Sequence, residues 1–354
     1  MKKGAKKSIK KVLHTFFKIF IIFMIATAAI NLILVGCIYL NHRSKLKDEK
    51  VYLTPPGTMV EVNGHKMHVL VDGAEDADET LVFLHSCSVV DDSIALQPLF
   101  EELDDYRLVY VDRSGVGFSE VSGASRDIDT ILEETRLALE GAGVKGPYTL
   151  VATGTGGIEA YHWAYKYPDE VERIIGISMN YPEQFSEITQ DEYCGFFDYL
   201  LVQFCKIGGQ RLVKSIYPGN DYMLYTEMQM NIRKALVSKG GYTMDMYNED
   251  LATVDNAAVV AAEGVPEDLD IYIIYANPLM EPYVSADSEV EDTYNQAVED
   301  NGEVDYVSVY NQEARTYFSR FDNVVFEEMS GPARLYTYCP KELAKKIAQY
   351  MDEK

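Results

Sequence analysis

Cysteine, histidine and positive charge are all scarce in this chain of 354 residues. Its five cysteines include no Cys-x-x-Cys pair, which excludes a disulfide framework and a zinc ribbon. The chain has 32 basic and 56 acidic side chains, for a net charge of −24. This balance argues against a nucleic-acid-binding protein, which needs cations to replace the phosphate counterions.

No cluster of His, Asp and Glu residues has the spacing of metal ligands, so we expect neither a metal site nor a cofactor. Three acidic runs, at 75–79, 287–292 and 299–305, are interpreted as solvated faces. Weak attraction of Ca²⁺ to these runs is the alternative interpretation.

Apolar residues are plentiful, at 47% of the chain with 25% charged, which is typical of a globular protein with a sizeable core. The charge is unevenly distributed. The first 50 residues carry a net +9, and the remaining 304 residues therefore carry −33. The sequence thus predicts two parts with opposite electrostatic character.

Residues 19–41 form an uncharged and mostly apolar run, and a helix needs about 20 such residues to cross a bilayer. Seven lysines precede this run, and an excess of positive charge on one flank marks the cytoplasmic side. We therefore predict a basic cytoplasmic tail (1–18), a transmembrane signal-anchor helix (19–41), a linker (42–55) and an extracytoplasmic domain (56–354). The expected localisation is a cell membrane of bacterial type, with a single pass.

Two alternatives remain for the N-terminal segment. A signal peptide could be cleaved after Ala26-Thr27-Ala28, although the apolar run is longer than the 7–15 residues usual in a cleaved signal. Leu34-Val35-Gly36-Cys37 is similar to a bacterial lipobox, with Cys37 as the lipidated residue. An acyl chain on Cys37 would also hold the domain at a membrane.

Beyond residue 55, short apolar strands alternate with helical patterns, which predicts an α/β fold with a mostly parallel sheet covered on both faces. Asn63-Gly64 indicates a hairpin turn between two alternating strands. The later strands are expected at 80–84, 107–111, 148–152, 174–178, 271–275 and 324–326. Residues 182–265 interrupt this alternation and are predicted to form a helical lid.

Ordered motifs from residue 55 to residue 350 resemble the α/β-hydrolase family, in its branch of esterases, epoxide hydrolases and proline peptidases. The most specific motif is Asp112-Arg113-Ser114-Gly115-Val116-Gly117-Phe118-Ser119, which matches that branch's DRxGxGxS turn. The supporting motifs are Pro56-Gly57, Asn63-Gly64, Leu84-His85, Gly146-Pro147-Tyr148, Gly156-Gly157, Tyr167-Pro168 and Glu170-Val171. The resemblance implies the α/β-hydrolase fold and a catalytic triad in the chain order Ser, Asp/Glu, His.

The positions that the resemblance assigns to the triad hold no catalytic side chain. The nucleophile position in Ala152-Thr153-Gly154-Thr155-Gly156 is Gly154, and the acid position falls near Leu279. Counting back from Pro340 places the base at Ala333, and no histidine follows residue 162 in any register. Some relatives carry the acid after an earlier strand, where this chain has Asn180 and Glu183.

The remaining pocket candidates are Ser86 and Cys87, in the loop that resembles the oxyanion loop, and Thr155 and Gly156, at the elbow. Three hypotheses follow: a membrane-anchored pseudoenzyme that binds a small molecule or a protein; an active hydrolase of an ester, amide or epoxide with a non-standard nucleophile; and a binding module that uses the amides of residues 154–157 as an anion nest. His85 and His162 are interpreted as structural residues.

Overall fold

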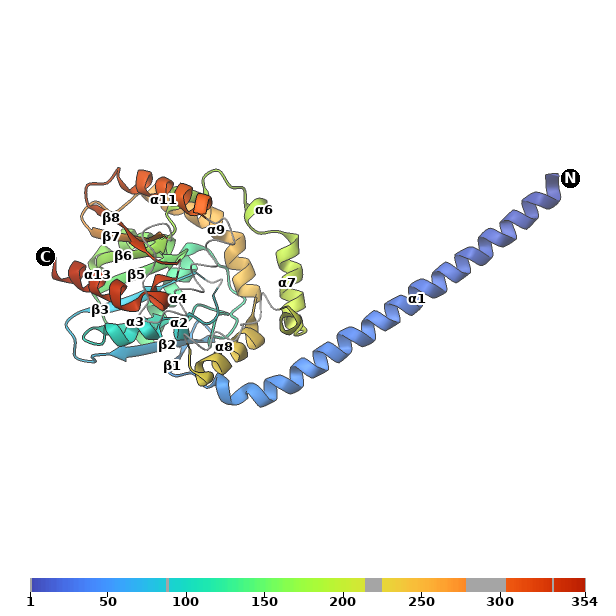
Figure 1. Ribbon diagram of the computed structural model, residues 1–354, viewed down its shortest axis with the longest axis horizontal. Coiled ribbons are helices and arrows are strands. Elements are labelled where there is room, and N and C mark those ends of the chain that lie inside the picture. The colour runs from blue at the N-terminus through green and yellow to red at the C-terminus, as the bar shows by residue number, and fades with distance from the viewer. Residues whose placement is uncertain (1, 87–88, 214–224, 278–303, 333, 354) are drawn as a thin grey trace.

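The computed structural model describes residues 2–86, 89–213, 225–277, 304–332 and 334–353. A long N-terminal helix extends away from a domain in which helices surround a central sheet (Figure 1). The strands are β1 (Thr58–Val62), β2 (His65–Gly73), β3 (Thr80–Leu84), β4 (Arg107–Val111), β5 (Tyr148–Gly154), β6 (Val171–Met179), β7 (Asp270–Asn277) and β8 (Val324–Ser330).

The described helices fall into two kinds. The α-helices are α1 (Lys2–Asp48), α2 (Asp92–Ala95), α3 (Gln97–Glu102), α4 (Ile128–Gly141), α5 (Gly156–Lys166), α6 (Gln190–Tyr193), α7 (Phe196–Lys206), α8 (Glu227–Gly240), α9 (Met244–Glu263), α11 (Val304–Phe318), α12 (Leu335–Tyr338) and α13 (Pro340–Asp352). The 3-10 helices are η1 (Glu49–Leu53), η2 (Pro168–Glu170), η3 (Pro182–Phe185) and η4 (Gly209–Leu212).

The eight strands form one sheet in the order β1-β2-β4-β3-β5-β6-β7-β8. β2 pairs antiparallel with both β1 and β4, and every other neighbouring pair is parallel. The predicted hairpin turn is present, with Asn63 and Gly64 at φ 48° and 91°. The predicted α/β class is therefore confirmed, and β3 and β4 have the predicted bounds.

Each strand in the middle of the sheet supplies alternate side chains to two apolar layers. In β3, Val82 and Leu84 face the layer formed with α4, α5, α9 and α11. Leu81 and Phe83 face the opposite layer, formed with α3, α12 and α13. Because side chains alternate along a strand, the four consecutive apolar residues 81–84 fill both layers, and the only polar residue of β3 is Thr80 at its start.

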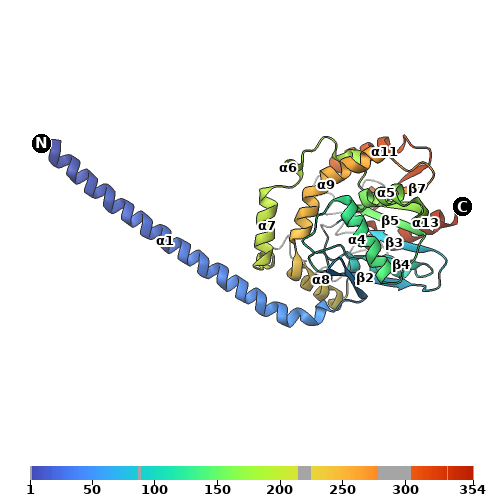
Figure 2. The same cartoon turned by 180° about the vertical axis from the view of Figure 1, so that it is seen from behind.

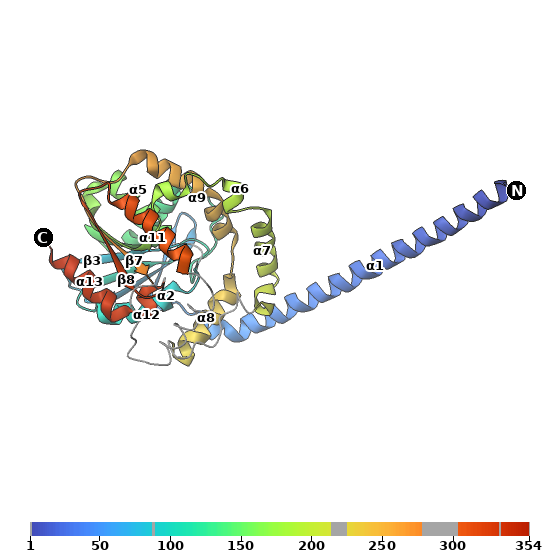
Figure 3. The same ribbon diagram turned by 45° about the horizontal axis from the view of Figure 1, so that its top comes forward.

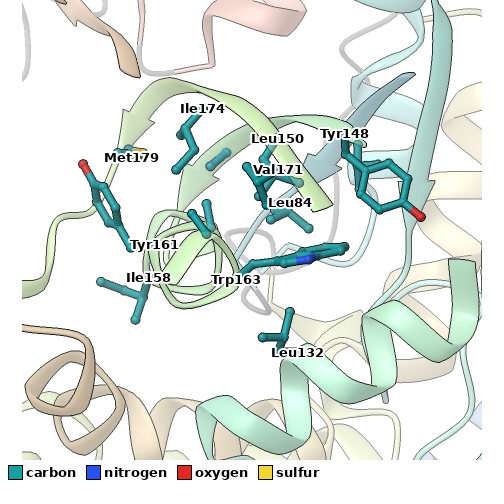
Figure 4. Close-up of a cluster of buried hydrophobic side chains, with 14 of the residues drawn as sticks. Leu84, Leu132, Tyr148, Leu150, Ile158, Tyr161, Trp163, Val171, Ile174 and Met179 are labelled. Carbon is teal, nitrogen blue, oxygen red and sulfur yellow. The ribbon is translucent and has the colours of Figure 1, made fainter. Parts of the chain in front are cut away.

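The only tryptophan, Trp163, is fully buried in the first of these layers. Figure 4 shows its ring between the sheet and Leu132 of α4. The ring lies edge-on to Tyr148 at 5.5 Å, and its Nε1–H donates to Glu170 Oε2 at 2.9 Å. Burying a ring of this size removes about 150–250 Å² from water, which stabilises the fold by roughly 4–6 kcal/mol.

Residues 182–265, here called the insertion, connect β6 to β7 and contain the helices from η3 to α9. Its described residues, 182–213 and 225–265, are largely helical. Lys239 fixes the insertion to the domain by donating from Nζ to the carbonyl oxygens of Gly117, Phe118 and Ser119 at 2.9–3.1 Å. The carboxylate of Asp245 accepts hydrogen bonds from the same long turn, at Ser114 and Ser122 among others.

Helix α1 and the segment that follows it differ from the expected linker. α1 contains a stretch that is long and apolar enough to cross a membrane, with none of it buried in the domain. Residues 42–53, predicted as linker, instead continue as helix through Asp48 and η1. The physical reason is a pair of contacts invisible to local sequence patterns: Arg211 of η4 makes a two-pronged ion pair with Glu49 and donates from Nε to His42 Nδ1 at 3.0 Å.

Candidate active site

The turn from β5 into α5 has the geometry of a nucleophile elbow without a nucleophile. Gly154 ends β5 at φ +49°, in the left-handed region that a residue with a Cβ adopts only at a cost. Its carbonyl accepts from the N–H of Asn180 at 2.8 Å. A Cβ added at Gly154 would lie 3.3 Å from the Cβ of Ser86 and 3.7 Å from Asn180 Oδ1. Ser86 therefore occupies part of the space that a side chain at 154 would need.

The next two glycines are required by close backbone packing. A Cβ added at Gly156 would lie 2.5 Å from the carbonyl oxygen of Leu84, and one at Gly157 would clash with the carbonyl oxygen of Asn180. Backbone atoms at the strand ends cannot move aside as a flexible side chain can. Helix α5 therefore packs closely against the ends of β3 and β6, although residue 154 at the elbow has no side chain.

Thr155 lies on a different side of the elbow from Ser86. Together with Arg113, Glu249 and Asn256 it lines a small cavity of about 10 Å³, which has room for about one water molecule. Within the described part of the chain, its hydroxyl has no hydrogen-bond partner. Neither Ser86 nor Asn180 is among the residues that line this cavity.

The two residues at the alternative acid position supply no carboxylate to the elbow. Asn180 is an amide, and its Nδ2 donates to Gln184 Oε1 at 2.9 Å. Glu183 pairs with Arg320 at 2.9 Å, and about half of each side chain is exposed to solvent. Glu183 therefore belongs to an exposed ion pair at the surface and not to the elbow.

His85 is the histidine whose backbone packs against the elbow, at Gly156. Its Nδ1 lies 3.0 Å from the carbonyl oxygen of Ser86 and 3.1 Å from Asp92 Oδ2, and its ring stacks on Tyr110 with 4.6 Å between centroids. Its Nε2 is buried and has no partner among the residues described. The other buried domain histidines near carboxylates are His65, His68 and His162, which lie beside Glu134, Asp112 and Glu263.

A buried cluster of opposite charges lies where the loop after β3, the insertion and the chain after β8 meet. Arg233 of α8 donates from Nε to Asp91, and its guanidinium lies 4.2 Å over the ring of Tyr225. Tyr336 donates from its hydroxyl to Asp92 Oδ1 at 3.3 Å. Burial raises the pKa of Tyr336 well above its usual value, and the Asp92 carboxylate raises it further.

Arg334 belongs to the same cluster and directly follows the position that the resemblance assigns to the catalytic base. Burial alone would lower the pKa of Arg334, but Tyr336, Asp91 and Asp92 together raise it above its usual value. The cluster thus balances two aspartates with two arginines. Sequence reasoning missed it, although the adjacent acids Asp91 and Asp92 after a buried strand were a visible signal.

Three of the residues singled out from the sequence, Cys87, Leu279 and Ala333, lie outside the described residues. The structure therefore places Gly154, Ser86 and Gly156 together at the elbow and Thr155 apart from Ser86. Among the residues that the structure describes, no group of three or more His, Cys, Asp and Glu side chains could hold a metal ion.

No family model matches the chain. The Bacillus subtilis protein YbdG is 27% identical over 349 residues, which is 96% of this chain and 99% of that protein. A pimeloyl-[acyl-carrier protein] methyl ester esterase of Shewanella sp. is 30% identical over 137 residues, which is 38% of this chain and 47% of the esterase.

Solved structures match over most of the chain at low identity. An epoxide hydrolase of Vigna radiata is 18% identical at a TM-score of 0.56, over 84% of this chain and 98% of the hydrolase. The enol-lactonase of Burkholderia xenovorans is 13% identical at a TM-score of 0.53, over 84% of this chain and 100% of the lactonase. Together with the strand order and the elbow at Gly154, these matches show that the domain has the α/β-hydrolase fold.

Proposed function

We propose that this protein is a membrane-anchored, extracytoplasmic pseudoenzyme, in which an α/β-hydrolase fold acts by binding a ligand or partner and not by turnover. The observation that carries the proposal is Gly154 at the tip of the elbow, at φ +49° and beside Ser86. An acyl-transfer enzyme of this fold needs a side-chain nucleophile at that tip, activated by a histidine.

The chemistry lost with the triad is large. Removing a catalytic triad lowers the rate by a factor on the order of 10⁶, and what then remains comes from oxyanion stabilisation and substrate binding. Ser86 stands where the family's oxyanion loop has glycine, and its Cβ restricts the backbone there. A single Gly154→Ser change is therefore not expected to restore activity, because the sequence after His162 offers no base.

The buried charge cluster supports a binding role. Asp91 and Arg233 connect the loop after β3 to α8 of the insertion, and Lys239 holds the same helix to three carbonyl oxygens. An insertion held by buried polar contacts favours a fixed surface over a lid that opens for each substrate. Breaking such a buried pair costs about 3–5 kcal/mol.

The anchoring part of the proposal depends on α1. Its apolar stretch is long enough to span a bilayer, and the lysines before residue 19 favour a cytoplasmic N-terminus. In that orientation the acidic domain lies outside the cytoplasm. Lipidation at Cys37 would give the same location by a different attachment, and mass analysis of the mature N-terminus distinguishes the two.

A serine-directed fluorophosphonate probe tests the loss of catalysis. The full-length protein in detergent micelles should remain unlabelled, as should its Gly154→Ser variant, while an active esterase of the same fold is labelled in parallel. Stoichiometric labelling of the unmodified protein, or ester hydrolysis that co-purifies with it, would overturn the proposal.

One observation favours the second candidate, a hydrolase with a non-standard site. The Asp92–His85 pair resembles an acid–base pair: Nδ1 of His85 lies between the Asp92 carboxylate and the carbonyl oxygen of Ser86, and Nε2 has no partner among the described residues. The matched relatives named for ester, epoxide and lactone chemistry define the substrates to try. Hydrolysis of any of these that is abolished by His85→Gln, Cys87→Ala or Thr155→Ala would establish this candidate.

A further inference from the structure

Helix α7 of the insertion presents an apolar face to solvent. Phe196 and Phe197 are 68% and 83% exposed, and Tyr199 and Leu200 are 39% and 43% exposed. At 100° per residue these four side chains lie on one side of the helix, opposite the buried Val202 and Cys205. Aromatic rings of this size rarely stay in water without a reason, and a contiguous group of them marks an interaction surface.

Helix α7 itself carries one acidic residue, although the domain is strongly acidic. The only acidic residue of α7 is Asp198, which lies on the other side of the helix and accepts from the N–H of Gly195 at 2.8 Å. Leu212 of η4, just beyond α7, is also exposed, at 65%. Leu212 therefore adds an exposed apolar side chain next to Arg211, the residue that contacts the N-terminal helix.

The N-terminal helix is fixed to the domain beside α7. His42 directly follows the apolar run and is buried against Gly208, where any Cβ would clash with the imidazole. Burial and the neighbouring Arg211 lower the pKa of His42, so that its neutral Nδ1 accepts the Arg211 hydrogen bond. Arg211 also pairs with Glu49, and so three side chains fix the direction in which α1 leaves the domain.

The figures show what this connection implies for α7. In Figures 1 and 3, α7 lies at the edge of the domain toward which α1 extends, and Figure 2 shows the same relation from behind. If α1 crosses a bilayer with residues 19–41, the membrane surface begins next to η4. The edge of the domain that carries α7 then faces that surface.

We propose that α7 is an interfacial helix, which lies in the headgroup region of the same bilayer that α1 spans, with Phe196, Phe197 and Leu200 toward the acyl chains. Tyr199 suits the boundary, because its apolar ring and polar hydroxyl fit the two environments there. This inference rests on the proposed membrane anchoring. It adds that the domain is held against the bilayer through its insertion and does not swing freely on its anchor.

Quenching by brominated phospholipids tests the position of α7. Full-length Phe197→Trp protein is reconstituted in nanodiscs of phosphatidylcholine and phosphatidylglycerol, with one chain per disc. The native Trp163 is fully buried and supplies a constant background. Tyr165→Trp is the matched control, because Tyr165 is also well exposed, at 56%, but lies at the end of α5, away from α7.

In the Phe197→Trp protein, brominated lipid should quench most of the emission that the new tryptophan adds. In the Tyr165→Trp protein, the added emission should not be quenched. Equal quenching at both positions, or none at either in a chain that remains in the disc, would overturn the inference for α7 while leaving the anchor intact. Failure of the chain to enter vesicles or discs at all would instead refute the anchoring, and with it this inference.

A second variant separates lipid contact from contact with another protein. Phe196→Ser with Phe197→Ser should leave the protein in the membrane fraction, because α1 is unchanged, while the domain becomes more accessible to protease near α7. Burial of the new indole ring at position 197 only in discs that hold two chains, seen as a blue shift of its emission without quenching by brominated lipid, would mean that the face binds a second copy of this protein. The assignment to lipid would then be wrong.

Discussion

Replacing Gly154 by alanine would test whether Ser86 and the elbow are sterically coupled. The substitution puts a Cβ at φ +49°, which costs a non-glycine residue about 1–2 kcal/mol. The same Cβ would lie 3.3 Å from the Cβ of Ser86, so the neighbour must give by a few tenths of an ångström. Two residues in contact couple by about 0.5–3 kcal/mol, and at this modest overlap we expect the low end, about 0.5–1 kcal/mol.

The double-mutant cycle therefore has a defined outcome. Gly154→Ala alone should lower the free energy of unfolding by about 1.5–3 kcal/mol, which a domain of typical stability survives. In a Ser86→Gly background the same change should cost only the backbone part, about 1–2 kcal/mol, because the steric partner is gone. The difference between the two costs is the contact itself.

Trp163 makes the measurement specific to the domain. It is the only tryptophan and is fully buried against α4, so its emission reports unfolding of the domain while α1 stays helical in the micelle. Denaturant titrations of the four proteins in one detergent give the cycle. Gly156→Ala is the contrast, since its Cβ would meet the backbone oxygen of Leu84 and Ser86→Gly cannot relieve it.

Two results would refute this reasoning. If Gly154→Ala is neutral, the elbow does not hold residue 154 in the left-handed region. If Gly154→Ala lowers the free energy of unfolding equally with serine and with glycine at position 86, then Ser86 does not occupy the space of the missing side chain. The presence of serine where the family has glycine would then have another cause.

Two further predictions concern buried charge. Arg233→Met should destabilise the domain by about 3–5 kcal/mol, because it leaves the Asp91 carboxylate buried without its arginine. Adding Asp91→Asn should recover most of this loss in the same denaturant assay. A double variant as unstable as Arg233→Met alone would count against the pair. Hydrogen bonds from Arg136, and then from Trp163, hold the pKa of Glu170 below its usual value of 4.5, so its contribution to stability is complete above pH 4.5 and is lost as the pH falls through the lowered value. Trp163 emission should therefore change in that acidic range, and the transition should disappear in Glu170→Gln; a transition that persists in this variant would assign it to another group.

Much of the fold was predictable because its signals are local. The apolar run in Thr80–Leu84 and the Asn63-Gly64 turn each encode their element in a few consecutive residues. The ends of β5 and β6 were less clear. β5 extends through Thr153 and Gly154 because these residues pair with Ile177 and Met179 of β6. Glycine has low strand propensity, so Gly154 belongs to the strand only because a neighbouring strand holds it.

The candidate site was predictable only in what it lacks. Residue identity alone shows that Gly154 has no side chain, and no tertiary contact can change that. The charges that fill the region were not predictable, because Asp91 and Arg233 are 142 residues apart in the chain and meet only through the packing of α8. The helical segment at 42–53 was missed for the same reason, since Glu49 needs Arg211 to hold it.

The sequence by itself determined the apolar segment long enough to span a bilayer, the order of strands and helices along the chain and the absence of a serine at the elbow, because hydrophobic length, periodicity and residue type are properties of the chain. Only the tertiary structure decided that Ser86 stands beside Gly154, that Arg233 neutralises Asp91 and that α7 lies on the side toward which α1 extends. These depend on distances between segments far apart in the sequence, and such distances are set by how the layers pack around the sheet.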